Sequence, residues 1–147
     1  MYAAKHCRFE REDAESTFNR ELEILELCQS PYIVKVYGTY DFDEGPHIGR
    51  GFLLEYSERS LGSFLHDKPV NIENEKFYHL GHVIRWMKCA AEGLRYIHNM
   101  DIIHRDVKPE NCLLFDYGQC LKLADFGVTR QAEVVMTSMA GRFGSQN

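Results

Sequence analysis

Apolar residues recur at helical spacing in two stretches of the chain, and each stretch predicts a helix with one buried face. In the first, Phe18, Leu22 and Leu25 lie three or four residues apart, which predicts a helix over residues 18–28. In the second, residues 78–99 keep this period for about five turns and predict a long core helix. The apolar positions of the second helix are Val83, Met87, Ala90, Leu94 and Ile97, with Trp86 beside them, and they are interpreted as core packing.

Short runs rich in β-branched and aromatic residues predict strands, and Gly and Pro between them predict turns. The predicted strands are Tyr2–Arg8, Ile33–Tyr40, Gly51–Tyr56, Cys112–Phe115 and Leu121–Ala124, and Leu61–Leu65 is predicted to be a short helix. Residues 41–50 contain Gly45-Pro46 and Gly49 and predict a hairpin connection. The sequence Gly49-Arg50-Gly51 precedes a strand rather than a helix, so it is not interpreted as a phosphate-binding loop.

The composition is that of an ordinary globular protein, and it excludes several functional classes. Of the 147 residues, 44% are hydrophobic and 27% are charged, and the net charge is −5. A chain of this charge is poorly matched to nucleic acid or to an anionic membrane surface, so no nucleic-acid partner is expected. No run approaches eighteen apolar residues, and the first residues form no apolar signal segment. We therefore expect no membrane insertion and a cytoplasmic location.

The five cysteines suggest neither a disulfide framework nor a zinc site, because they are odd in number and form no C-x-x-C pair. We expect them to be reduced and mostly buried.

Two polar motifs in the second half of the chain carry the chemistry. His104–Asn111 reads H-R-D-V-K-P-E-N, and the sequence Asp125-Phe126-Gly127 begins fourteen residues after Asn111. Carboxylate and amide oxygens are hard ligands of the kind that Mg²⁺ takes, and phosphoryl transfer depends on positioning groups and neutralising charge. A surface turn is the alternative, because Asp, Asn, Lys and Pro are common in loops. The D-F-G sequence at this distance disfavours a plain turn.

The two motifs resemble the catalytic core of the eukaryotic protein kinases, where they follow one another in this order. The resemblance implies an α+β, two-lobed kinase-like fold. Residues 1–57 would form part of the N lobe and the hinge between the lobes, and residues 58–147 would form part of the C lobe. It also implies that the protein uses ATP and Mg²⁺.

The resemblance gives roles to the residues of the motifs. Asp106 would accept the proton of the substrate hydroxyl, and Lys108 would reach the transferred phosphoryl group. Asn111 belongs to the same catalytic set, and together with Asp125 it would hold Mg²⁺. The protein substrate would carry a Ser or Thr acceptor, because Lys108-Pro109-Glu110 resembles the serine/threonine kinases.

A lysine and a glutamate near the start of the chain complete the nucleotide site that the resemblance implies. In the family a lysine of the third strand holds the phosphates and pairs with a glutamate of the first large helix. Lys5 would be this lysine and Glu21 its partner, since Glu23 and Glu26, the alternatives, lie on another face of the predicted helix. The residues expected to bind the cofactor are Lys5, Glu21, Glu55, Ser57, Leu113 and Asp125.

Within that set, residues 55–57 would be the hinge whose backbone groups contact adenine. Leu54 would screen the pocket behind the ring, and Leu113 would lie beneath it. The segments Pro31–Gly38, Leu53–Tyr56 and Ser60–His66 look like the tyrosine-kinase-like group. Within that group they resemble the mitogen-activated kinase kinase kinases related to the transforming-growth-factor-β-activated kinase.

The chain departs from the family pattern at both ends. Only four residues precede Lys5, where the family has the strands of the glycine-rich loop, and residues 128–147 end before an A-P-E motif. We therefore expect an incomplete fold that also lacks the C-terminal helices, with little activity and marginal stability when it is expressed alone. Apolar faces around Leu94, Ile97, Ile102 and Leu113 would then meet solvent. The alternative function is a catalytically inactive kinase-like fragment that acts through protein binding.

Regulation is expected in the segment that follows the D-F-G sequence. Arg105 lies beside Asp106, where a cation can receive a phosphorylated residue through charge-assisted hydrogen bonds. The candidate acceptors are Thr137 and Ser138, with Thr129 behind them, and an upstream kinase or activator would be the partner.

Overall fold

The computed structural model describes residues 1–8, 13–44, 47–66 and 80–131. The described elements are β1 (Tyr2–Arg8), α1 (Ala14–Leu27), β2 (Val36–Glu44), β3 (His47–Glu55), β4 (Arg59–Ser60), α2 (Leu61–His66), α3 (Leu80–His98), β5 (Ile102–Ile103), the 3-10 helix η2 (Pro109–Asn111), β6 (Cys112–Phe115), the 3-10 helix η3 (Asp116–Gly118), β7 (Cys120–Leu123) and β8 (Arg130–Gln131). This mixture of helices and antiparallel sheets confirms the predicted α+β class.

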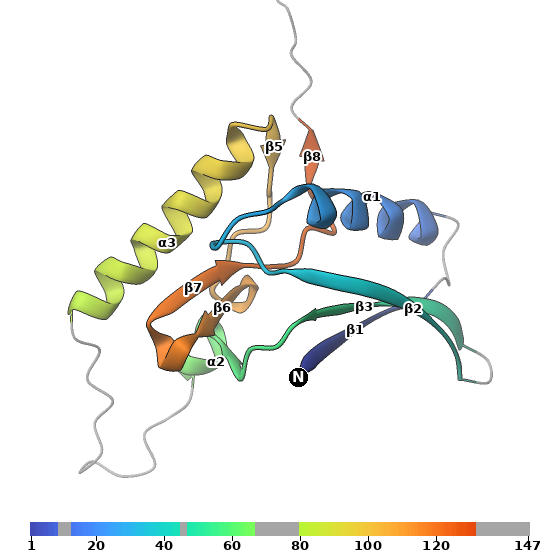
Figure 1. Cartoon of the computed structure of the whole chain (residues 1–147), viewed down its shortest axis with the longest axis horizontal. Coiled ribbons are helices and arrows are strands. Elements are labelled where there is room, and N and C mark those ends of the chain that lie inside the picture. Colours follow the sequence, from blue (N-terminus) through green and yellow to red (C-terminus); the bar gives the residue numbers. More distant parts are fainter. Residues whose placement is uncertain (9–12, 45–46, 67–79, 132–147) are drawn as a thin grey trace, which may run out of the picture.

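The first part of the molecule is a three-stranded antiparallel sheet in the order β1-β3-β2, with α1 lying along it (Figure 1). Phe18 of α1 stacks on Phe52 of β3 with ring centroids 4.2 Å apart, and both rings are buried. Leu25 lies on the same face of α1 and is also buried. The helical spacing of apolar residues therefore predicted the correct inner face of this helix.

The hairpin predicted around residues 41–50 is confirmed, because β2 and β3 pair antiparallel, but its connection is shorter than predicted: β2 continues to Glu44 and β3 already begins at His47. The glycine at 51 belongs to the interior of β3, where it faces Tyr40 of β2. A Cβ atom at Gly51 would lie 2.4 Å from the Tyr40 ring. The glycine therefore makes room for an aromatic ring that crosses the strand.

The second part of the molecule contains α3 and the sheet β4-β6-β7, with the pair β5-β8 at one side (Figure 1). Gly93 allows α3 to approach β7 closely, since a Cβ atom there would lie 3.0 Å from Leu123 Cδ1. The buried residues of α3 are Trp86, Cys89, Gly93 and Ile97. Trp86 and Ile97 are buried as predicted, and Ala90 and Leu94 are partly buried against the core. The prediction was wrong at Val83 and Met87, which are 39% and 67% exposed.

Ile97 and Ile102 were expected to meet solvent, but both are completely buried within the described part of the chain. The large apolar side chains that α3 exposes lie near its start, and they are Leu80, Val83, Ile84 and Met87. None of the described helices combines the length and the apolar character that a membrane span requires.

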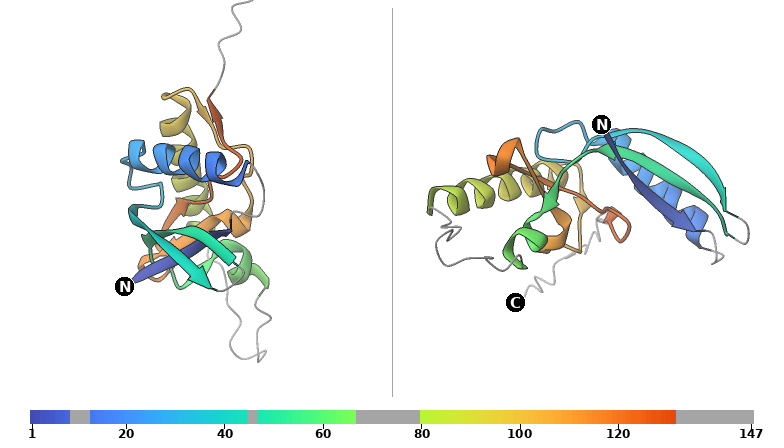
Figure 2. Two further views of the ribbon diagram at one scale, coloured as in Figure 1. Left: turned by 90° about the vertical axis from the view of Figure 1, so that its right-hand side faces the viewer. Right: turned by 90° about the horizontal axis from the view of Figure 1, so that it is seen from below.

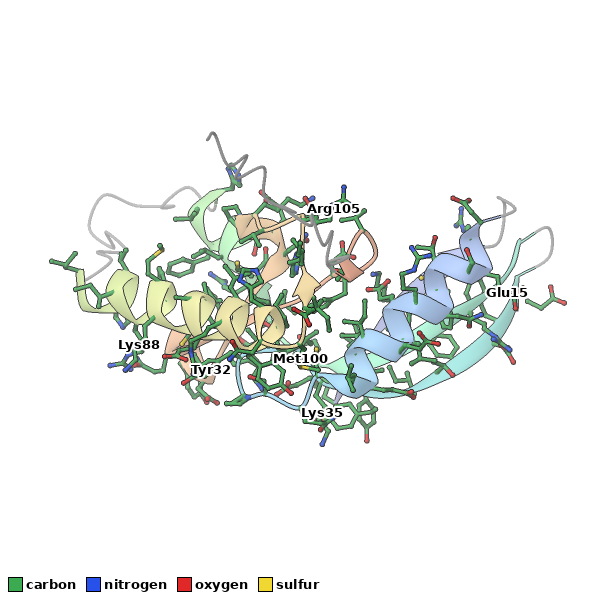
Figure 3. All side chains as sticks on the ribbon, turned by 90° about the horizontal axis from the view of Figure 1, so that it is seen from above. Glu15, Tyr32, Lys35, Lys88, Met100 and Arg105 are labelled. Atoms are coloured by element: carbon green, nitrogen blue, oxygen red, sulfur yellow. The ribbon has the colours of Figure 1, made fainter. Side chains whose placement is uncertain are left out.

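Two segments join the two parts, which lie side by side in Figure 2. One is the stretch that follows β3. The other is Tyr32–Val34, which runs along β7: Leu123 N donates to Tyr32 O (2.8 Å), and Val34 N donates to Leu123 O (2.9 Å). In Figure 3, Tyr32 lies beside α3 and Lys35 lies nearer α1. The strand predicted from Ile33 therefore begins only at Val36, because its first residues are used in this junction.

All five cysteines are free, as expected. Cys28, Cys89 and Cys112 are buried, and Cys7 and Cys120 are half-buried. Burial raises the pKa of the Cys28 thiol to about 11, so it stays protonated at neutral pH.

Candidate active site

Lys5 and Glu21 form an ion pair between β1 and α1, with Nζ 2.6 Å from Oε1. Glu21 is buried because it shares the inner face of α1 with Phe18 and Leu25, whereas Glu23 and Glu26 are exposed. The structure thus makes the pairing that the sequence predicted.

Lys5 also reaches Asp125, with Nζ 2.9 Å from Oδ1. Burial alone would lower the pKa of Lys5, but the charge and the hydrogen bond of Glu21, with those of Asp125, raise it above the usual value. Burial alone would raise the pKa of Asp125, but the hydrogen bond and the charge of Lys5 lower it. The lysine and Asp125 therefore both stay charged at neutral pH.

The backbone at Asp125 is fixed by its neighbours. Phe126 N donates to the same Oε1 of Glu21 (3.2 Å), and the Phe126 ring is buried. Asp125 has φ of +64°, in the left-handed region that costs a non-glycine residue about 1 kcal/mol or more. Glu21 thus holds both the lysine and the chain next to Asp125.

The loop before η2 organises a second group of charges around Asp106. Its Oδ2 accepts hydrogen bonds from Lys108 Nζ (2.7 Å) and from Asn111 Nδ2 (2.9 Å). Asn111 Nδ2 also donates to the backbone oxygen of Asp106 (2.9 Å). The hydrogen bond from Lys108 lowers the pKa of Asp106 and raises that of Lys108. Asp106 is therefore an ionised carboxylate with one oxygen, Oδ1, turned to no described donor.

Backbone contacts connect the two groups of charges. Ala124 N donates to Asn111 O (2.9 Å), which ties the residue before Asp125 to the end of the loop. The buried His104 ring adds a second tie: Nε2 lies 3.0 Å from Ala124 O, and Nδ1 accepts the N–H of Asp106 (3.3 Å). With Nδ1 as an acceptor, the proton lies on Nε2. Burial lowers the pKa of His104, in keeping with this neutral form.

The site offers a partial set of ligands for Mg²⁺. Both hydrogen bonds of the Asn111 amide nitrogen go to Asp106, which leaves its amide oxygen without a described partner. That oxygen and the Asp125 carboxylate are the hard donors that Mg²⁺ prefers. The described residues contain no group of three or more His, Cys, Asp or Glu that could hold a metal ion. Phosphate oxygens and water would have to supply the other ligands, as is usual for this ion.

Two side chains of the predicted hinge make contacts with other residues of the same chain. Glu55 Oε1 lies 2.5 Å from Lys122 Nζ, and Ser57 Oγ donates to Leu114 O (2.6 Å). Leu54 of β3 and Leu113 of β6, predicted around the adenine ring, are both half-buried. The partner of Glu55 was missed in the sequence, because Lys122 lies 67 residues further on.

Two arginines line a cavity of about 560 Å³ whose wall also includes Asp106. Arg105 comes from the loop, where it has φ of +69°, and Arg20 comes from α1, directly before Glu21. The sequence interpretation missed Arg20, although its position beside Glu21 was a usable signal. Neither arginine has an ion pair with a described residue, so the cavity presents two available cations.

The candidate phosphorylation sites have different outcomes. Thr137 and Ser138 lie outside the described residues. Thr129 is 1% exposed, and its Oγ1 donates to His104 O (3.4 Å). A hydroxyl that is buried and hydrogen-bonded in this way is a poor phosphate acceptor, so the structure contradicts the choice of Thr129.

Comparison with known proteins relates the site to one family. Residues 1–145 match the model of the protein kinase domain. Mitogen-activated protein kinase kinase kinase 7 of Drosophila melanogaster is 34% identical over 126 residues, which cover 83% of this chain and 17% of the relative. The kinase mom-4 of Caenorhabditis elegans, of the same kinase kinase kinase class, is 33% identical over 129 residues, or 86% of this chain and 22% of the relative. Mitogen-activated protein kinase kinase 9 of Arabidopsis thaliana is 36% identical over 112 residues, or 76% and 32%. The chain thus spans a third or less of each of these relatives.

Proposed function

This chain belongs to the protein kinase family, and from that premise we propose that it transfers the γ-phosphoryl group of ATP to serine or threonine residues of protein substrates. The observation that carries the proposal is the arrangement of charges. Lys5 bridges Glu21 and Asp125, while Asn111 hydrogen-bonds Asp106 and accepts the N–H of the residue before Asp125. A lysine for phosphates and a carboxylate for a hydroxyl proton are thereby held in one site.

Asp106 is the proposed proton acceptor. Lys108 and Asn111 occupy its Oδ2, so Oδ1 is available to the hydroxyl of the substrate. Because its pKa is lowered, this carboxylate is ionised at neutral pH and can both orient the hydroxyl and take its proton. The hydrogen bond from Lys108 keeps the ammonium group beside the oxygen where the new phosphoester forms.

The other charged residues bind and orient the nucleotide in this proposal. Lys5, restrained by Glu21, would contact the phosphates of ATP. Mg²⁺, held by Asn111 and Asp125, would neutralise phosphate charge when it is bound. Backbone groups of residues 55–57 would contact adenine, next to Leu113. The complete set of charged residues favours this function over a binding-only fragment, in which nothing requires Lys5, Glu21 and Asp125 to meet.

We further propose a cytoplasmic protein whose lobes divide near residue 57 and whose activity an upstream kinase controls. A phosphate on Thr137 or Ser138 would bind between Arg20 and Arg105, since two available guanidinium groups suit a dianion. The activation ratio of the phosphorylated Arg20→Ala variant tests whether Arg20 binds this phosphate.

The main test is phosphoryl transfer from radiolabelled ATP by the protein purified from its own cells. With Mg²⁺ and a generic protein substrate, label should appear on serine and threonine. Asp106→Asn should lower turnover by about 10²–10⁴-fold, the usual contribution of a positioned base. Asp101→Asn is the matched control, because Asp101 is exposed on the turn after α3 and its left-handed φ of +57° suits asparagine. Full activity of the Asp106 variant, or label on tyrosine alone, would refute the proposal.

A further inference from the structure

The hinge segment, residues 55–57, is attached to the second part of the molecule through side chains. Glu55 uses both carboxylate oxygens: Oε1 binds Lys122 Nζ (2.5 Å), and Oε2 accepts the N–H of Lys35 (3.3 Å). Glu55 N also donates to Lys35 O (2.8 Å). The side chains of Glu55 and Lys122 are only 22% and 17% exposed, so water and salt screen their attraction weakly. This contact fixes the first residue of the hinge.

Lys122 is itself held rigidly. It lies in β7 opposite Leu113 of β6, and its ammonium group is 4.6 Å from the centroid of the Phe115 ring. The next residues along β7 lead directly to Asp125. The partner of Glu55 is therefore part of the strand that delivers the proposed metal ligand.

Ser57 provides a second attachment two residues further on. Its hydroxyl lies 2.6 Å from Leu114 O and 2.9 Å from Arg59 O. The hinge is thus tied to β7 at its first residue and to β6 at its last, with Tyr56 between them. The Tyr56 side chain itself is exposed.

We infer that Glu55, Lys122 and Ser57 form a hinge clamp, a set of positioning residues that holds the backbone of residues 55–57 at a fixed distance from β6 and β7. Adenine would be contacted by backbone groups of the hinge, which need no particular side chains. The clamp gives the side chains of Glu55 and Ser57 a function of their own. Its effect on nucleotide affinity rests on the proposed function. Its effect on hinge rigidity rests only on the contacts.

The exposed ion pair Arg50–Asp41 offers a matched control on the same sheet. The Arg50 Nε to Asp41 Oδ1 distance is 2.8 Å, but the side chains are 41% and 79% exposed. Exposed pairs of this kind contribute little to stability. Asp41→Asn removes one charge, as Glu55→Gln does, without touching the hinge.

The first experiment measures hydrogen–deuterium exchange of the full chain without nucleotide. Glu55→Gln, Lys122→Met and Ser57→Ala should each accelerate exchange of the amides in residues 53–60 by at least about threefold, because local opening no longer has to break a clamp contact. The charge-reversed pair, Glu55→Lys with Lys122→Glu, should recover part of the protection. Asp41→Asn should leave the exchange unchanged. Unchanged exchange in the clamp variants, or equal acceleration in the control, would overturn the inference.

The second experiment measures the KM for ATP and kcat of the same variants. The clamp variants should raise KM by about three- to tenfold and keep kcat within about twofold, because a displaced hinge weakens binding before it alters the reacting groups. Equal losses in kcat with unchanged KM would overturn the role in nucleotide binding. If the unmodified protein transfers no phosphate at all, the proposed function fails, and the exchange experiment still decides the hinge clamp.

Discussion

Replacing Lys5 by methionine should destabilise the fold through the charge it leaves behind. Glu21 is only 5% exposed at its side chain, and without Lys5 its carboxylate would keep a single described donor, the N–H of Phe126. Removing one partner of a buried pair costs about 3–5 kcal/mol. Lys5 is 32% exposed, so water already screens the pair in part, and we expect Lys5→Met to cost about 2–3 kcal/mol. Methionine preserves most of the apolar stem, which limits the loss of packing.

The unpaired charge of the Glu21 carboxylate, rather than the loss of the lysine contacts, should account for the loss of stability in Lys5→Met. Glu21→Gln alone keeps an oxygen for Phe126 N, and Lys5 keeps Asp125, so the expected cost is about 1 kcal/mol. The double variant contains no unpaired buried charge at Glu21. It should therefore be about 1–2 kcal/mol more stable than Lys5→Met alone, a coupling that a double-mutant cycle isolates.

Urea unfolding and thermal melting measure both the destabilisation by Lys5→Met and the recovery of stability in the double variant. For a chain of this size, 2–3 kcal/mol corresponds to a fall of about 5–10 °C in the Tm. Asp41→Asn, which breaks an exposed pair, should change stability by less than about 0.5 kcal/mol. A Lys5→Met variant as stable as the unmodified chain, or a double variant no more stable than Lys5→Met, would refute the reasoning.

Two further expectations concern pH and regulation. Burial lowers the pKa of His104 despite the opposing charges of Asp106 and Asp125, so its contribution to stability is present above the unfolded pKa of about 6.5 and is lost as pH falls through the folded value. The Tm should fall between about pH 7 and pH 5, and less steeply in His104→Gln; equal slopes would contradict this. In the phosphorylated protein, Arg20→Ala should reduce the activation ratio several-fold by removing one of the two cations beside the cavity, the other being Arg105. An activation ratio equal to that of the unmodified protein would exclude Arg20 from the phosphate site.

The sequence predicted those features that depend on short-range periodicity. In α1 one apolar series of i, i+3 and i+4 positions is dominant, and it placed Glu21, not Glu23 or Glu26, on the face toward Lys5. In α3 two such series overlap. Gly93 and Trp86 belong to the series that faces the core. A pattern of apolar residues does not identify Gly93 as a core position, because its importance lies in the close approach to Leu123 that it allows.

The sequence patterns could not predict contacts between residues that lie far apart in the chain. The sequence placed Gly51 at the start of a strand but could not show why a glycine is needed there, because the Tyr40 ring that requires it lies on a neighbouring strand. The pairing of Glu55 with Lys122 depends on the placement of β3 against β7, and Arg20 lines a cavity with Arg105 only because α1 approaches the loop. Motifs could name the residues proposed to react, while these supporting contacts required the three-dimensional arrangement.

The left-handed backbone at Arg105 has a consequence for how the sequence can change over time. Three of the other non-glycine residues described with positive φ are aspartates, whose short polar side chains tolerate that conformation. Arginine has no such advantage, so folding alone would favour glycine or asparagine at position 105. An arginine at position 105 therefore has a conformational cost, which its proposed use as a phosphate-binding cation would offset. In a copy of the gene released from selection, mutation of position 105 to glycine or asparagine could improve folding at the expense of the proposed phosphate contact.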